Sequence, residues 1–161
     1  PILLLLFLFY FGLFEVIGLN LSTITASCLV LGMASAAYQS QIFRGSIETL
    51  PVGQFRAARA LGMNDGQAIR HIVLPQALRL SIPGWSNEFS ILLKDSAICY
   101  VLGTQDIMAR TSFVAARTHE HLPLYITAGL LYFGITLVGV HLLRVLERKV
   151  HIPGYAVSGS M

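Results

Sequence analysis

Charged side chains are scarce in this sequence. Only 12% of its 161 residues are Asp, Glu, Lys or Arg, while 55% are hydrophobic. A soluble domain carries about 25% charged residues, so the composition excludes an ordinary soluble domain and predicts a membrane protein. The net charge is only +3, and the positions of the charges are therefore more informative than their sum.

Motifs of enzymes and metal proteins are also missing. The sequence has no GxxxxGK[ST] phosphate loop, which excludes the usual way of binding and hydrolysing ATP. No nucleophile and base stand in a recognisable pattern, so we expect no enzyme activity. Cys28 and Cys99 lie in apolar runs without a CxxC partner and are expected to be small buried residues. His119 and His121 lack the companions of a zinc site, so no metal or other cofactor is expected.

Long apolar runs are present instead. A membrane-spanning helix needs about 20 mostly apolar residues, and residues 21–43, 80–102 and 124–143 meet that requirement. Residues 2–14 form a shorter apolar run that begins beside Pro1. We expect this run to be the end of a helix whose start is missing, which implies an N-terminally truncated chain.

The predicted fold class is an all-α, multi-spanning transmembrane helix bundle. We expect one transmembrane domain over residues 1–149 and a C-terminal cytoplasmic tail over 150–161. The second apolar run is rich in small residues, which allow another helix to approach closely. These residues are Ser27, Gly32, Ala34, Ser35, Ala36 and Ala37.

Basic residues divide unevenly between the two sides of these runs. Eight lie within 44–79 or near the C-terminus, and two lie within 104–123. The positive-inside rule predicts that 44–79 and the C-terminus are cytoplasmic, and that 15–20 and 104–123 are external. The basic tail is too short to suggest nucleic-acid binding and fits an interfacial anchor. The inner set is Arg44, Arg56, Arg59, Arg70, Arg79, Arg144, Arg148 and Lys149, and the outer set is Arg110 and Arg117.

The inner loop 44–79 has helical structure of its own. Residues 54–61 are rich in Ala and Arg and predict a short helix, which Gly62 ends. Asn64, with Gln67 three positions on, predicts a capping box for a second helix, which we expect Pro75 to stop. Phe55, Ala58 and Leu61 recur every three residues and predict one partly apolar face on the first helix. The spacing alone leaves three uses open, namely the lipid surface, packing under the bundle, and docking to a partner protein.

The segment "QFRAARALGMNDGQAIRHIVLP", residues 54–75, resembles the EAA loop of binding-protein-dependent ABC importer permeases. The flanking segments "SQIFRGSIETLPVGQ" and "PQALRLSIPGWSNEFSILLKDSA" are similar to the polar amino-acid branch, the histidine, glutamine and arginine type. The resemblance covers Pro1 to about Lys149 and implies that the first helix and most of the second are missing. The matching residues in the loop are Ala57, Ala58, Gly62, Ile72, Leu74 and Pro75.

This resemblance implies a type I ABC importer permease whose loop helix couples to an ATPase subunit. The coupling residues would be Phe55, Arg56, Ala57, Ala58, Arg59, Leu61 and Gly62. One position departs from the family pattern, because Arg56 stands where the family has Glu. The sign of the charge is reversed there, so either the partner carries a compensating charge or the contact rests on the apolar face and Gly62.

Three charges interrupt the apolar run 80–102, namely Glu88, Lys94 and Asp95. Charges inside a membrane cost a few kcal/mol and persist where they face a bundle interior or a water-filled cavity. At about 100° per residue, Glu88 and Asp95 share a helix face, while Lys94 lies about 120° round from Glu88. One interpretation is a self-contained pair of Lys94 with Asp95 or Glu88 that holds helices together. The other is a solute site.

A solute site would use complementary charges on an amino acid. Lys94 suits the carboxylate of the solute, and Glu88 suits a distal cation. Asn87, Ser90 and Asp95 complete the candidate substrate-binding set, with Ser86 and Ser96 as further hydrogen-bonding groups. The resemblance implies that residues matching Glu88 and Lys94 line the membrane site in relatives. Glu88 therefore favours arginine, lysine, histidine or a related basic compound.

The sequence thus predicts a multi-pass permease subunit in the cytoplasmic (inner) membrane of a prokaryote. The expected partners are a pair of cytoplasmic ATP-binding subunits, a second permease chain, a periplasmic or cell-surface solute-binding protein, and an amino-acid substrate. Two alternatives stay open. One is a permease for another class of small solute, and the other is a membrane assembly module whose buried charges are structural.

Overall fold

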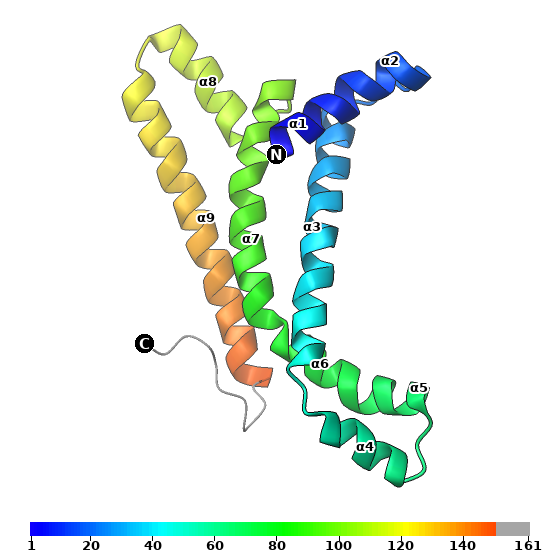
Figure 1. Ribbon diagram of the computed structural model, residues 1–161. Coiled ribbons are helices and arrows are strands. Elements are labelled where there is room, and N and C mark those ends of the chain that lie inside the picture. The colour runs from blue at the N-terminus through cyan, green and yellow to red at the C-terminus, as the bar shows by residue number, and fades with distance from the viewer. Residues whose placement is uncertain (151–161) are drawn as a thin grey trace.

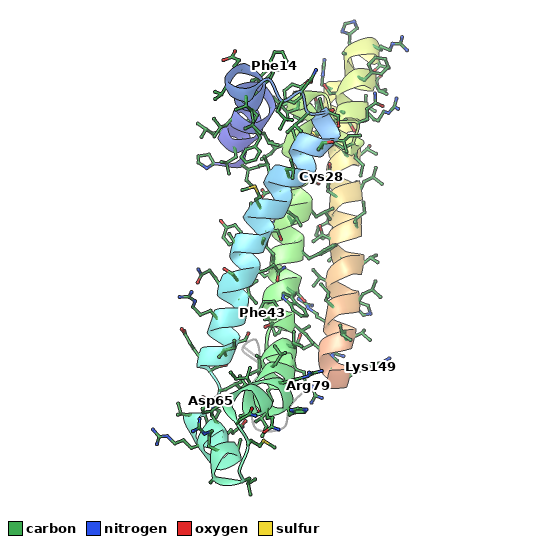
Figure 2. All side chains as sticks on the ribbon, turned by 90° about the vertical axis from the view of Figure 1, so that its right-hand side faces the viewer. Phe14, Cys28, Phe43, Asp65, Arg79 and Lys149 are labelled. Carbon is green, nitrogen blue, oxygen red and sulfur yellow. The ribbon has the colours of Figure 1, made fainter. Side chains whose placement is uncertain are left out.

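Three long helices side by side form the body of the molecule in the computed structural model (Figures 1 and 2). They are α3 (Thr23–Glu48), α7 (Ile82–Ser96) and α9 (His121–Val150). The structure describes residues 1–150, without the side chain of Val150, and the predicted tail lies outside these residues except for that helix end. The predicted all-α fold is confirmed.

Shorter helices cover the two ends of this body. At one end lie α1 (Ile2–Phe7), the π-helical turn η1 (Leu8–Gly12) and α2 (Leu13–Ile17), which run at an angle to α3 (Figure 1). At the same end, α8 (Ile107–Thr118) folds back against α9. At the other end lie α4 (Val52–Ala60), α5 (Asp65–Ala68), the π-helical turn η2 (Ile69–Val73) and α6 (Leu74–Leu80).

The sequence did not predict α8. The stretch 104–123 read as an external loop, yet Asp106 caps a helix there by accepting a hydrogen bond from the backbone N–H of Ala109 (2.7 Å). The helix ends at His119, whose φ of 59° turns the chain into α9. Asp106 was a usable signal, because aspartate is a favoured N-cap residue. The apolar face of α8 is much shorter than the predicted spans, and the helix was therefore missed.

Within residues 1–150, α9 is the one helix that is both long and apolar enough to cross a membrane. Only 6% of the most apolar stretch of this helix is buried against the rest of the chain. α7 has 15 residues and continues as the 3₁₀-helix η3 (Ala97–Leu102). α3 has 26 residues, including Arg44 and Glu48 at its end. The exposed apolar side chains of α9 need lipid or other helices as their environment.

Close helix contacts rest on glycines that the sequence pattern did not single out. A Cβ atom at Gly84 would lie 2.6 Å from Cγ2 of Ile42, and one at Gly139 would lie 2.2 Å from Cε1 of Phe89. These two contacts join α7 to α3 and to α9. By contrast, Gly32 of the predicted small-residue run faces open space. The position of Gly32 thus leaves room that the described part of this chain does not fill.

The core of the molecule lies near the end where α1 meets α3. Leu6, Ala26, Val30, Cys99 and Leu102 are buried together there. The side chains of Ser27 and Thr104 share a hydrogen bond of 3.0 Å beside this core. Cys99 is buried as expected, whereas the expectation for Cys28 is wrong because it points out of α3 and is exposed.

The end with α4, α5 and α6 forms an elbow, which we define as residues 49–80. Gly62 ends α4 with a φ of +86°, and Asn64 and Gln67 form the capping box of α5, so both predictions are confirmed. The predicted stop at Pro75 is wrong. The chain stays helical from Asp65 to Leu80, because the wide π turn η2 shifts the hydrogen-bond register just before Pro75 and leaves it in the first turn of α6, where a missing N–H costs little.

Candidate translocation site and coupling elbow

Glu88 is a buried acid near the middle of α7. Its side chain is only 5% exposed, and among residues 1–150 it forms no hydrogen bond or ion pair, since the one ion pair there joins Arg59 and Asp65. Its oxygens are not fully enclosed, because in the same part of the chain the one fully buried side-chain atom without a partner is Nε1 of Trp85. A carboxyl group so largely removed from water and without a partner is still costly. Such a group indicates a use that the isolated chain does not satisfy.

The helix register explains why Glu88 points inward. Ser81 and Gly84, seven and four positions earlier, lie on the same face of a helix. The hydroxyl of Ser81 donates to that of Ser46 on α3 (2.9 Å), and Gly84 packs on Ile42 of α3. Glu88 therefore lies on the side of α7 that faces α3. Asp95, seven positions later, shares this face and is half-buried.

Lys94 lies away from this face. It is exposed, as is Asn87, and Lys94 is about 9 Å along the axis from Glu88 at about 1.5 Å per residue. Within the described part of the chain, Lys94 pairs with neither Glu88 nor Asp95. The self-contained ion pair considered above is therefore not formed here.

The serines of α7 have their protons engaged within the helix. Ser86 donates to the carbonyl of Ile82 (3.2 Å), and Ser90 donates to that of Ser86 (3.0 Å). Ser96 donates likewise to Leu93 (2.7 Å). Each hydroxyl oxygen keeps its lone pairs for a further donor. These serines thus suit an ammonium or guanidinium group better than a carboxylate.

Polar contacts join α4 to α6 inside the elbow and α3 to the start of α7 at its edge. The side-chain amide of Gln76 donates to Gln54 of α4 (2.6 Å) and to the carbonyl of Ile72 (2.9 Å). Ser46 and Ser81 link α3 to the start of α7. A movement of α4 therefore acts on α6, which leads directly into α7. The elbow, with Asp65 in it, lies at one end of the bundle (Figure 2).

The predicted coupling residues divide between the two sides of α4. Ala58 is 1% exposed and Phe55 is half-buried, so they face the rest of the elbow. Arg56 and Ala57 are exposed, and Arg59 pairs with Asp65. The expected apolar face does not extend to Leu61, which is 82% exposed, because the helix ends at Ala60 and Leu61 is its C-cap.

An apolar cavity of about 300 Å³ opens beside α4. It lies between the end of α3, the start of α4 and η2. Its lining combines half-buried and exposed apolar side chains, which leaves apolar surface for a neighbouring chain or lipid to cover. The lining residues are Ile47, Leu50, Pro51, Val52, Gln54, Phe55, Ile69 and Val73.

A bundle of apolar helices with an inward acid and a helical elbow at one end fits a membrane transport component. The chain belongs to the family of binding-protein-dependent transport system inner membrane components, whose model matches residues 1–152. The family resemblance drawn from residues 54–75 is thereby confirmed.

Similar proteins indicate which kind of transport component this is. The chain is 36% identical to the octopine transport system permease protein of Rhizobium radiobacter, covering 92% of this chain and 68% of that protein. It is 37% identical to the arginine transport system permease protein of Bacillus subtilis (strain 168), with the same coverage. A crystal structure of an amino acid ABC transporter with histidines superposes with a TM-score of 0.86 at 36% identity, covering 92% of this chain and 69% of that one.

Proposed function

We propose that this chain is the permease subunit of an ABC importer of polar, basic amino acids. The observation that carries the solute class is Glu88, a buried acid without a partner in the middle of α7. A guanidinium or ammonium group is the natural complement of such a carboxylate. The transport of octopine and arginine by two of the relatives supports this solute class.

Lys94 takes the carboxylate of the solute in this proposal. It is exposed on a side of α7 turned away from Glu88, and a charge in contact with lipid would cost a few kcal/mol. A water-filled chamber between this chain and a second permease chain would remove that cost. Asn87, Ser90 and Asp95 belong to the same proposed substrate-binding set, with the serine as an acceptor.

Transport would proceed by alternating access. Glu88 is 5% exposed, so α7 must move against α3 before a solute in this chamber can reach both Lys94 and Glu88. Two ATP-binding subunits would draw together on the elbow, and the Gln54–Gln76 and Ser46–Ser81 contacts would pass that motion to α7 and α3. ATP thereby shifts which side of the membrane the chamber faces. A solute-binding protein would deliver the solute at the other end.

The proposed organisation follows the distribution of charge. The transmembrane domain covers residues 1–149, and the elbow and the C-terminus face the cytoplasm of a prokaryote. Arg79, Asp65 and Lys149 all lie toward one end of the bundle, opposite to Phe14 (Figure 2). The positive-inside rule favours that basic end as the cytoplasmic one.

The test compares Glu88→Gln with the unaltered complex. Solute-stimulated ATPase activity is measured in proteoliposomes with arginine, lysine, histidine, glutamine and alanine. Losing a hydrogen bond to a charged group costs about 1.5–3 kcal/mol, so half-stimulation by basic solutes should need roughly 10 to 150 times more solute. Stimulation by neutral solutes should change little.

Equal losses for all solutes, or no loss, would refute the role of Glu88. Stimulation by a different class of compound with no response to amino acids would favour the first alternative, a permease for another small solute. A complex that stimulates no ATPase with any solute would favour the assembly module.

A further inference from the structure

The outward face of α4 presents one arginine among small residues. Ala58 is 1% exposed and fixes the inward side of this helix. Arg56, two positions earlier, lies about 200° away and therefore points outward. Gly53, Ala57 and Ala60 surround it and are exposed, so another protein can approach the helix closely.

The two arginines of α4 differ in their pairing. Arg59 forms an ion pair with Asp65 across the turn that follows the helix. Arg56 has no hydrogen bond or ion pair to any residue in 1–150, and the sequence of α4, VGQFRAARA, contains no acid. The charge that α4 offers to a partner is thus that of Arg56.

Covering this arginine restricts the chemistry of the partner. A charge that loses its water without gaining a partner costs several kcal/mol. The planar guanidinium group binds a carboxylate through two parallel hydrogen bonds, which no neutral group reproduces. The elbow lies at the free end of the molecule, where α4 has no other described helix beyond it (Figure 1).

We propose that the ATPase subunit places an Asp or Glu side chain against Arg56, and that this pair selects the ATPase subunit that the permease accepts. This inference rests on the proposed function, since it names the chemistry of the partner at the coupling helix. Arg56 stands where the family has Glu, and the acid on the ATPase subunit would compensate for this change of sign.

The first experiment compares Arg56→Glu, Arg56→Gln and the matched control Arg70→Glu. Arg70 is also exposed on the elbow, in η2, so its reversal changes the elbow charge equally without altering the face of α4. The complex is isolated through a tag on the permease, and the dissociation constant of the ATPase subunit is measured in detergent.

Arg56→Glu should weaken binding at least about 30-fold, as loss of a buried charge pair does. Arg56→Gln should weaken it less, and Arg70→Glu by less than about threefold, because charges outside the contact are screened. Binding by the unaltered permease should weaken with rising salt, and this dependence should be smaller for Arg56→Gln. Binding by Arg56→Glu equal to that of the unaltered chain would overturn the proposal.

The second experiment identifies the acid. Variants of the ATPase subunit that restore transport with Arg56→Glu are selected from a random library. Recovery of Asp or Glu changed to Lys or Arg, with no rescue of the inactive control Ala58→Asp, supports the pair. Restoring variants that never alter an acidic residue would contradict it.

Ala58→Asp separates this inference from the proposed function. Ala58 lies on the buried side of α4. A larger, charged residue there displaces the helix, whatever Arg56 contacts. If the ATPase subunit still binds this variant at full strength, the proposed coupling role of α4 fails. If Ala58→Asp abolishes binding while the Arg56 variants bind normally, only the acid partner is refuted.

Discussion

The elbow and the long helices differ in whether their polar side chains have partners within the chain. In the elbow, polar side chains have partners within the chain: Asn64 with Gln67, Gln54 with Gln76, and Arg59 with Asp65. In the long helices, Glu88 is buried without a partner and Lys94 is exposed along an apolar helix.

The elbow is therefore complete within this chain, whereas the long helices need further partners. The elbow keeps its shape through contacts between its own side chains, so it can pass on a motion as a rigid piece. The long helices leave charges and apolar surface that only lipid, solute or another subunit can satisfy. Stability and transport should therefore depend on different residues, and substitutions can separate them.

Replacing Glu88 with methionine should give the largest separation of stability and function. The apolar side chain removes a buried polar group without a partner, so the free energy of unfolding should rise by about 1–3 kcal/mol, while transport of basic amino acids should be lost. Unfolding by denaturant in detergent micelles and uptake in proteoliposomes measure the two effects.

Glu48→Met provides the matched control, because Glu48 is exposed at the end of α3. Its stability should change by less than about 0.5 kcal/mol. If Glu88→Met instead destabilises the protein, then Glu88 has a structural partner in the complex and the contrast between the two regions is wrong.

Gly139→Ala should destabilise the contact between α7 and α9. The new methyl group would meet Cε1 of Phe89 at 2.2 Å, and overpacking of this kind costs about 1–3 kcal/mol. Gly134→Ala is the control on the same helix, because nothing lies within 4 Å of its added Cβ. The same denaturation assay measures both variants, and equal stabilities would show that α9 shifts freely against α7.

How far the sequence predicts this structure depends on the range of the interactions. The capping box at Asn64 and the end of α4 at Gly62 were predictable because each depends on a few neighbouring residues. The 100° rotation per residue correctly separated Lys94 from Glu88 and Asp95. The stop at Pro75 was wrong, because the proline rule assumes a regular α-helix and η2 is a π turn.

Contacts between helices could not be predicted from the sequence. The apolar pattern predicted three spans, but it did not predict that Gly84 meets Ile42 or that Gly139 meets Phe89. Several residue types would have fitted a close approach, and only the three-dimensional register selects among them. The direction of Glu88 toward α3 likewise depends on the contact between Ser46 and Ser81, which are 35 positions apart.

Gly62→Ala should produce the smallest effect of the three on stability, yet a clear one on coupling. The φ of +86° at Gly62 costs a residue with a Cβ atom about 1–2 kcal/mol, although the space around it is open. The strain should displace the turn between α4 and α5, so solute-stimulated ATPase activity should fall while binding of the solute does not. Gly45→Ala is the control in α3, outside the proposed docking face of α4, where the backbone is helical and the added Cβ also meets nothing, so it should leave coupling intact and slightly stabilise the helix. Hydrogen exchange of the amides in 52–68 detects the displacement of the turn locally. Equal exchange in the two variants would mean that the elbow does not depend on this turn for its shape, and that its rigidity comes from the contact between Gln54 and Gln76 instead.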